Sequence, residues 1–199
     1  YAYSNQPPIT KWNLARFAEC LIPLIDKNEE AAIKIATDVI DNFQNIYEKK
    51  WLNMMRDKLG LFGEDKNDRK LIDDLLNWME KHKIDYTNTF CHLMEIKIDD
   101  NTYKEEAFIT WFEEWKKRSK LNNSSKEKQI EFMKKNNPIV IPRNHKVEEA
   151  LSEAYNGNLE KMNKLNNVLK NPYSNQKDIA EYQVPAPMTD EKYQTFCGT

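Results

Sequence analysis

The sequence predicts an all-α fold, an irregular helical bundle, from three observations. Glycine accounts for only four of the 199 residues, which disfavours the tight hairpins of β-sheet proteins. Hydrophobic residues make up 40% of the chain and recur mostly at three- and four-residue steps, the spacing of amphipathic helices. A chain of this length also fits one domain. We therefore expect residues 1–199 to form a single helical domain, in which residues 137–199 contribute an extended segment, a helical hairpin and a mobile tail.

The first helix is expected after Pro7-Pro8, because proline suits a first helical turn, where its missing N–H would have no partner. Pro23 lies inside the same pattern and should kink or end the helix. The apolar face of this helix is wide: Ile9, Trp12, Leu14, Phe17, Leu21, Leu24 and Ile25.

The longest helical pattern runs from about Asn28 to Leu59 and predicts one amphipathic helix. Gly60 and Gly63 should end it, because glycine adopts the left-handed conformation of a helix C-terminus without strain.

Four shorter helices are expected next. Asp65 or Asn67 can cap the first, the second begins at about Asp85, and Ser125 caps the fourth. The third carries rings that helical spacing assigns to the core: Phe108, Trp111, Phe112 and Trp115.

The pattern changes at residues 137–142, which are bracketed by prolines and β-branched in the middle. This segment should be extended. Asn144 then caps a helix, Asn156-Gly157 turns the chain, and a further helix continues to about Leu169. After Pro172 the helical signal fades into a tail.

Charge and composition limit the partners and the compartment. The net charge is −2 and the charges are interleaved, without the basic stripe of a nucleic-acid-binding protein. No apolar run reaches the 18 residues of a membrane span. Three cysteines without a CxxC pair indicate a reducing compartment, and we expect a cytoplasmic protein. The start, Tyr1–Pro8, is polar and unlike a signal peptide; it lacks an initiator Met, which fits processing or a piece of a longer chain.

No residue is predicted to be catalytic, cofactor-binding or metal-binding. The histidines His82, His92 and His145 lack zinc-site spacing. Cys91 and His92 suggest a thiol–base pair, but neighbours on a helix point about 100° apart and need another geometry to meet.

The cysteines fall into two classes. Cys20 and Cys91 lie in apolar patterns and are expected to be small core residues. Cys197 lies near the end of a glycine-containing tail, where an exposed thiol suits thiol–disulfide exchange or is an incidental surface residue. We expect Cys197 to react first in a native thiol titration.

Several stretches resemble a known family in the same order along essentially the whole chain. They are Tyr1–Pro8 with Trp12–Arg16, Met55–Leu61, Asn137–Ala150, Gly157–Leu159, Leu169 with Pro172-Tyr173, and the Cys near the terminus. The string from Asn137 to Ala150 is long and specific. Together these stretches resemble segments of the selenoprotein O family.

The resemblance implies a kinase-like fold that transfers AMP from ATP to Ser, Thr or Tyr hydroxyls of proteins, with Mg or Mn. In such an enzyme the ATP and metal ligands lie upstream of the segment that resembles Tyr1-Ala2-Tyr3. The chain would then correspond to the late C-lobe helices and the C-terminal helical extension. Its expected partners are the missing N-terminal kinase-like lobe and the protein substrates of the parent enzyme, and the segment alone should be inactive.

The resemblance also implies a redox-active cysteine near the C-terminus, at Cys197, which in bacterial relatives can pair with a second Cys upstream. Two positions depart from the family pattern: the chain ends Cys197-Gly198-Thr199 rather than Cys-Ser-Ser, and Ser4 stands where Gly is frequent. Both keep the thiol, but they leave the geometry of the tail open.

Three functions compete. The chain can be the scaffold of an adenylyltransferase, with the first helix around Trp12 and Phe17 as the surface that meets the missing lobe. It can be a non-enzymatic helical interaction module that uses Trp111, Phe112 and Trp115. It can also be a redox enzyme in its own right, for which Cys20 or Cys91 would have to supply the resolving thiol.

Overall fold

The computed structural model describes residues 5–96, 98, 101–177 and 179–187. Throughout these residues every regular element is a helix and no strand occurs, which confirms the all-α prediction. By contacts the chain divides into an N-terminal unit, Tyr1–Met55, and a C-terminal unit, Arg56–Thr199, and each is described by itself. The single-domain organisation expected from the sequence stays a prediction.

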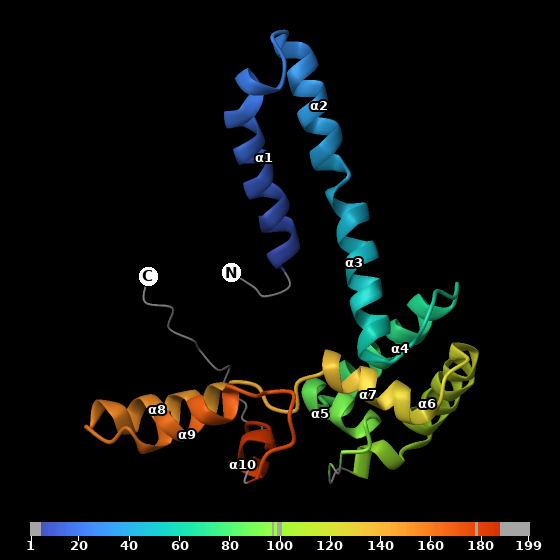
Figure 1. The fold of residues 1–199 in the computed structure, drawn as a ribbon, viewed down its shortest axis with the longest axis vertical. Helices are drawn as coiled ribbons and strands as arrows, with labels where there is room; N and C mark the ends of the chain where they lie inside the picture. The colour runs from blue at the N-terminus through green and yellow to red at the C-terminus, as the bar shows by residue number, and fades with distance from the viewer. Residues whose placement is uncertain (1–4, 97, 99–100, 178, 188–199) are drawn as a thin grey trace. The chain divides into compact units, whose positions relative to one another are not determined.

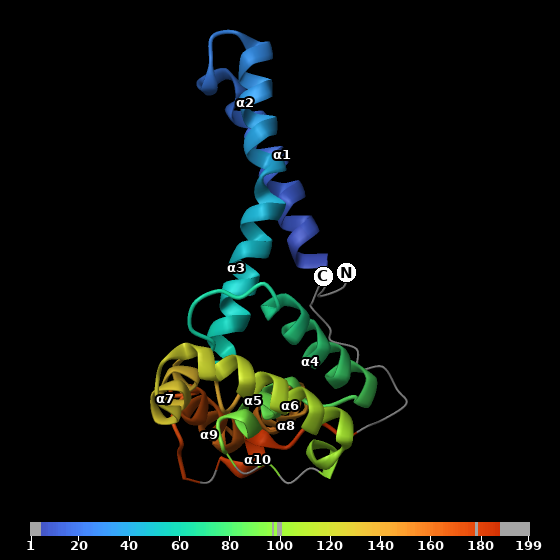
Figure 2. The same cartoon turned by 90° about the vertical axis from the view of Figure 1, so that its right-hand side faces the viewer.

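The N-terminal unit is built on two antiparallel helices, α1 (Gln6–Ile25) and α2 (Glu29–Asp41), which pack side by side (Figures 1 and 2). Pro7 and Pro8 lie in the first turn of α1, and the helix ends two residues after Pro23. The Asn28 side chain caps α2 by accepting a hydrogen bond of 3.0 Å from the Ala31 N–H.

The expectation of one helix from Asn28 to Leu59 was wrong, because α2 ends at Asp41 and α3 (Phe43–Lys58) is a separate helix. Asn42 lies between them, and its side-chain oxygen accepts a hydrogen bond of 3.2 Å from the Asn45 side chain. Asparagine interrupts helices in this way because its side chain offers local hydrogen bonds that compete with the helical pattern. The apolar periodicity alone did not reveal the break.

The C-terminal unit packs its helices around a dense core. After the end of α3 come α4 (Asp68–His82), α5 (Tyr86–Leu93), the 3₁₀ turn η2 (Asn101–Lys104), α6 (Glu106–Ser119), the turn η3 (Lys120–Asn122) and α7 (Lys126–Asn136). Ser125 caps α7 as the sequence predicts, and Asp85, predicted only as the approximate start of its helix, caps α5. Side chains that are 2% exposed or less include Leu59, Ile72, Leu75, Phe90, Met94, Met133, Ile139 and Val140.

Gly60 closes α3 in the left-handed conformation, with φ +63°, as the sequence predicts. Its Cα lies so close to α7 that an added Cβ would come within 2.7 Å of the Gln129 and Met133 side chains. Gly63 has φ +70° but open space around it. Gly60 is therefore needed for its conformation and for its size, whereas Gly63 is needed for its conformation alone.

The remainder of the C-terminal unit follows the predicted order. Residues 137–143 form no regular element, and α8 (Asn144–Tyr155) and α9 (Glu160–Leu169) pack against each other as a hairpin. Arg143, not Asn144, is the residue at the N-cap of α8, and its side chain makes no capping bond because it is engaged elsewhere. The short helix α10 (Ala180–Gln183) ends the described helices.

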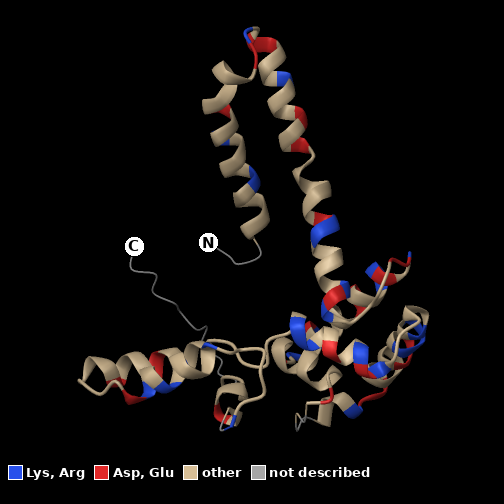
Figure 3. Cartoon of the chain, viewed as in Figure 1, with Lys and Arg blue, Asp and Glu red and all other residues tan. Residues whose placement is uncertain are grey.

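Within the described part of the chain, no helix combines the length and the apolar character that crossing a bilayer requires. Lys and Arg are mixed with Asp and Glu along the helices of the C-terminal unit (Figure 3).

Candidate interaction groove

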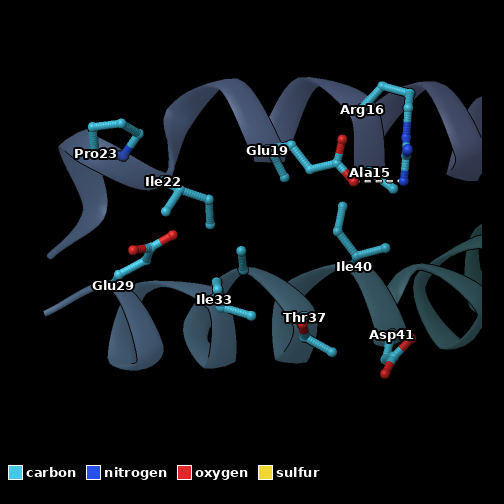
Figure 4. A pocket seen from close by; sticks show the side chains of 12 residues that line it. Ala15, Arg16, Glu19, Ile22, Pro23, Glu29, Ile33, Thr37, Ile40 and Asp41 are labelled. Atoms are coloured by element: carbon cyan, nitrogen blue, oxygen red, sulfur yellow. Dashed lines mark ion pairs between the residues drawn. The ribbon is translucent and has the colours of Figure 1, made fainter.

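The clearest candidate site is a groove between α1 and α2, which encloses about 580 Å³. Ile22 of α1 and Ile40 of α2 point into the space between the two helices (Figure 4). Small residues on both helices keep the groove open. The described residues that line it are Ala15, Arg16, Ala18, Glu19, Ile22, Pro23, Glu29, Ile33, Ala36, Thr37, Ile40 and Asp41.

The groove is mainly apolar inside and charged at its ends. Arg16 Nη2 lies 2.6 Å from Glu19 Oε1, one helical turn away on α1 (Figure 4). Lys11 joins the two helices through a contact of 3.3 Å to Asp41. These pairs are exposed, so they orient the helices but add little to stability.

The two helices are also apolar on the sides that face away from the groove. Leu14, Phe17 and Leu24 recur at three- and seven-residue steps on α1, and Ile35 and Val39 lie four apart on α2. All five are exposed, with 61% of Phe17 and 82% of Leu24 accessible. Charged residues such as Lys11 and Glu19 also lie on α1, but a contiguous exposed apolar side is typical of a surface that another part of a protein covers.

α1 buries none of its residues, and α2 buries only Ala32 and Ala36. Trp12 is 57% exposed and lies under the Arg16 guanidinium at 5.6 Å. The first helix around Trp12 and Phe17 therefore carries a bare apolar surface, and its role as the surface that meets the missing lobe stays a prediction.

The predicted cysteines have different fates. Cys91 is fully buried, as expected. Burial, the larger cause, and the negative charge of Asp85 together raise the pKa of its thiol to about 11. The expectation for Cys20 was wrong: it is exposed, because it falls on a side of α1 that nothing in the N-terminal unit covers. Cys197 lies outside the described residues, so its redox role stays a prediction.

The Cys91–His92 pair does not behave as a thiol and its base. The His92 ring stacks on Tyr103, with 4.1 Å between ring centroids. Because the pKa of Cys91 is raised, its thiol stays protonated at neutral pH and is a poor nucleophile.

The aromatic rings of α6 belong mainly to the core. Trp111 and Trp115 are each 7% exposed, and their indole N–H groups donate to the carbonyl oxygens of Leu71 at 2.8 Å and Leu59 at 2.9 Å. Phe112 is half-buried. An interaction module built on these three rings is therefore disfavoured.

Asp68 is the centre of a buried charge cluster that sequence reasoning missed. Its carboxylate is fully buried and accepts hydrogen bonds from Arg56 Nε at 2.7 Å, Arg118 Nε at 2.6 Å and the Asp65 N–H at 2.9 Å. Burial by itself would raise the pKa of Asp68, but the bonds from Arg118, the Asp65 backbone and Arg56 outweigh it and lower the pKa. The cluster fixes the start of α4 against the ends of α3 and α6.

Arg143 forms the second buried cluster. It binds both carboxylate oxygens of Asp85, at 2.6 and 3.0 Å, and donates to the Tyr182 carbonyl at 3.1 Å. Asn88 donates to the Gln183 carbonyl at 3.1 Å, which fastens α10 to α5. The guanidinium is thus used for structure.

Asn137 has a similar structural role at the other end of the string 137–150. Its side-chain amide donates to the carbonyl oxygens of Lys58 and Met133, both at 2.8 Å. Asn137 and Arg143, two polar members of the most specific string in the sequence, therefore hold helices together.

Among the described residues, no group of three or more His, Cys, Asp or Glu side chains is arranged to hold a metal ion. His82 lies 3.1 Å from Glu105 at the surface, a single pair rather than a ligand set.

Known proteins of one family are similar to this chain over nearly its whole length. Residues 1–170 match the profile of the family described as "Protein adenylyltransferase SelO". Proteins called "Protein nucleotidyltransferase YdiU" are similar over 100% of this chain: that of Pelagibacter ubique (strain HTCC1062) is 57% identical, that of Bacillus cereus (strain AH820) 47% and that of Clostridium perfringens (strain 13 / Type A) 46%. The chain spans 41% of the length of these relatives.

Proposed function

Because the chain belongs to the SelO family of protein adenylyltransferases, we propose that it is the C-terminal helical part of an enzyme that transfers AMP from ATP to Ser, Thr or Tyr hydroxyls of proteins. In that reaction the hydroxyl oxygen bonds to the α-phosphorus of ATP, the bond to the β-phosphate breaks, pyrophosphate leaves, and a base takes the hydroxyl proton. The role proposed for this chain is to scaffold the catalytic lobe.

The chemistry is assigned to the part of the longer enzyme that this chain does not cover. Nucleotidyl transfer needs a metal-bound triphosphate and cationic side chains directed at the phosphates. The described residues offer no acidic cluster for a metal, and the buried Arg56, Arg118 and Arg143 are engaged by Asp68 and Asp85. We therefore propose that ATP and Mg or Mn bind outside this chain.

The observation that carries the scaffold role is the uncovered hairpin of α1 and α2. Phe17 and Leu24 are exposed on one side of α1, and the groove opens on the other. Fully burying one such side chain is worth about 1.5–3 kcal/mol, so covering several would hold two parts of a protein together. The occupant proposed for this surface is the catalytic lobe of the same enzyme.

Cys197 is proposed to supply a redox-active thiol near the end of the chain. The support is its position in the family pattern. Cys91 is buried with a raised pKa and is therefore unsuited to be the resolving thiol of a redox enzyme made of this chain alone, which leaves the exposed Cys20 as the candidate for that role.

The proposal is tested with a chimera in which this chain replaces the matching 41% of the Pelagibacter ubique relative. With ATP labelled at the α-phosphate, the chimera should label protein, whereas ATP labelled at the γ-phosphate should leave protein unlabelled. The chain alone should transfer no label. Labelling by the chain alone would overturn the assignment of the chemistry to the rest of the enzyme.

The hairpin is tested in the same chimera with Phe17→Glu, which places a charge on the exposed apolar side of α1. We expect at least about tenfold less label transfer, because a charge at the centre of an apolar interface costs roughly 2 kcal/mol or more. Lys34→Glu, an exposed charge change on α2, is the matched control and should keep the activity.

To separate docking from folding, the two parts are expressed as separate chains and their association is measured by calorimetry. Phe17→Glu should weaken association while the circular dichroism of this chain stays unchanged. If Phe17→Glu associates as well as Lys34→Glu does, the hairpin is not the docking surface. An inactive chimera, together with a chain that still binds other proteins through the hairpin, would favour the alternative of a non-enzymatic interaction module.

A further inference from the structure

A second cavity, of about 340 Å³, lies within the C-terminal unit where the end of α5, the last turns of α6 and the start of α7 meet. This aromatic–lysine cavity has an apolar floor and a charged rim, and neither belongs to the hairpin. Its lining includes Leu93, Phe112, Trp115 and Ile130 in the floor, and Glu95, Lys116, Lys120 and Lys126 at the rim.

The floor is held in place before any ligand arrives. The Trp115 indole is fixed by its bond to the Leu59 carbonyl, and the Phe112 ring lies against it with 5.2 Å between centroids. Gln129, which also lines the cavity, is 8% exposed and donates to Ser119 Oγ at 2.8 Å. A preformed apolar surface of this kind loses little conformational freedom when a ligand binds.

The rim carries three lysines and one glutamate. Lys116 lies over the Phe112 ring, 4.7 Å from its centroid, and also contacts Glu113 at 2.8 Å. Lys126 pairs with Glu95, and this exposed pair lies at the edge of the cavity. The ammonium group of Lys120 has neither an ion pair nor a hydrogen bond among the residues that the structure describes.

We propose that this cavity binds a small amphipathic organic anion, an aryl carboxylate, with its ring on the Phe112–Trp115 floor and its carboxylate between Lys120 and Lys126. The volume lies at the small end of the range of ligand pockets, about 300–1,000 Å³, which suits one ring with a short acidic chain. Among the charged side chains of the lining, the positive excess selects anions. Glu95 opposes binding, because it competes with the ligand for Lys126.

The test uses the full chain, labelled with ¹⁵N, and 3-phenylpropionate as the probe. Titration should shift the indole N–H signal of Trp115, which a Trp115→Phe variant identifies. Propionate lacks the ring and 3-phenylpropylamine carries the opposite charge, so both should bind at least several-fold more weakly. Equal binding of the amine, or no shift at Trp115 with 3-phenylpropionate, would overturn the proposal.

Charge variants sharpen the test. Lys120→Met should weaken 3-phenylpropionate binding by about threefold, and Glu95→Gln should strengthen it by a similar factor, as expected for partly exposed charge contacts. The matched control is Lys117→Met, which removes an exposed lysine of α6 that does not line the cavity. All three side chains are exposed, so folding should be kept. An affinity of Lys120→Met equal to that of Lys117→Met, or weaker binding by Glu95→Gln, would rule the site out.

Discussion

Two regions differ in how far they bury their apolar side chains: the α1–α2 hairpin leaves most of them exposed, whereas the C-terminal unit encloses them. The hairpin buries only two alanines and leaves Trp12, Phe17 and Leu24 mostly accessible. The C-terminal unit encloses large side chains such as Leu75 and Phe90 completely. The C-terminal unit is therefore stabilised by a core of its own, whereas most large apolar side chains of the hairpin stay accessible within the N-terminal unit, as the proposed docking role requires.

Polar groups show the same contrast. The C-terminal unit buries two arginine–aspartate clusters, around Asp68 and Asp85, in which the charges are paired with short bonds. Buried pairs of this kind persist only where surrounding structure is fixed, because desolvating an unpaired charge is costly. Lys11–Asp41 and Arg16–Glu19, the pairs of the hairpin, are exposed.

The largest expected effect comes from Asp68→Asn. Removing the carboxylate takes away the buried charge that Arg56 and Arg118 share, although Arg56 keeps a contact of 3.5 Å to the exposed Glu64. The free energy of unfolding should fall by about 3–5 kcal/mol. Urea denaturation followed by near-ultraviolet circular dichroism measures it. Asp74→Asn, which breaks an exposed pair with Lys70, is the control and should change the stability by about 0.5 kcal/mol or less.

The Asp68 cluster also gives a pH signature. Because its folded-state pKa lies below the ordinary value of 3.8, the carboxylate contributes stability that is present above pH 4 and is lost as the pH falls through the folded pKa. The difference between wild type and Asp68→Asn should therefore shrink as the pH falls below 4. A difference that stays constant down to the acid transition would contradict the charge-based explanation.

The next prediction compares the loss of a buried side chain in the C-terminal unit with the loss of an exposed one in the hairpin. Leu75→Ala removes a fully buried side chain and should cost about 2–5 kcal/mol. Phe17→Ala removes a larger side chain from the hairpin but should cost about 0.5 kcal/mol or less in the chain alone. The same denaturation experiment measures both. A large cost for Phe17→Ala would mean that the chain covers the hairpin by itself, and the comparison would fail.

A smaller effect tests how tightly α3 packs on α7 within the C-terminal unit. Gly60→Ala should cost about 2–4 kcal/mol, since it combines left-handed strain with a clash against Gln129 and Met133. Gly63→Ala meets no neighbour and should cost only the strain, about 1 kcal/mol. Thermal unfolding resolves the two, and equal costs would mean that α7 gives way easily.

The smallest perturbation is chemical and leaves the fold intact. With a disulfide reagent at pH 8, Cys20 should react in the native chain, whereas Cys91 should react only after unfolding. A pKa of about 11 leaves Cys91 about a hundredfold less thiolate than its ordinary value of 9.0 would, and burial adds to the protection. The Cys20→Ser variant isolates the reaction of Cys197 and tests whether that thiol reacts first. Fast native labelling of Cys91 would show that the core around α5 opens readily.

Periodicity predicted the helical class and the order of most helices, because these follow from local spacing. The exposure of Trp12 and Phe17 was expected instead from the resemblance to part of a longer enzyme. Periodicity missed the break at Asn42, because the apolar spacing continues across this residue although the helix does not. It misplaced Cys20, because a helix with apolar residues around its circumference does not reveal which side is covered.

The buried clusters could not be predicted from local pattern. Asp68 and Arg118 lie 50 positions apart in the sequence, and Arg143 and Asp85 lie 58 apart. In sequence each resembles an ordinary surface charge. The groove could not be predicted from local pattern either, because it forms only where α1 and α2 lie against each other.

The attachment of α10 to α5 also limits where the end of the chain can act. Gln183 is held at both of its polar ends, through its carbonyl to Asn88 and through its side chain to the Ile139 carbonyl. Cys197 follows Gln183 by 14 residues, and a residue spans at most about 3.6 Å. Even fully extended, this length of chain keeps the sulfur of Cys197 within roughly 50 Å of Gln183. Any thiol with which it forms an intramolecular bridge has to lie within that distance.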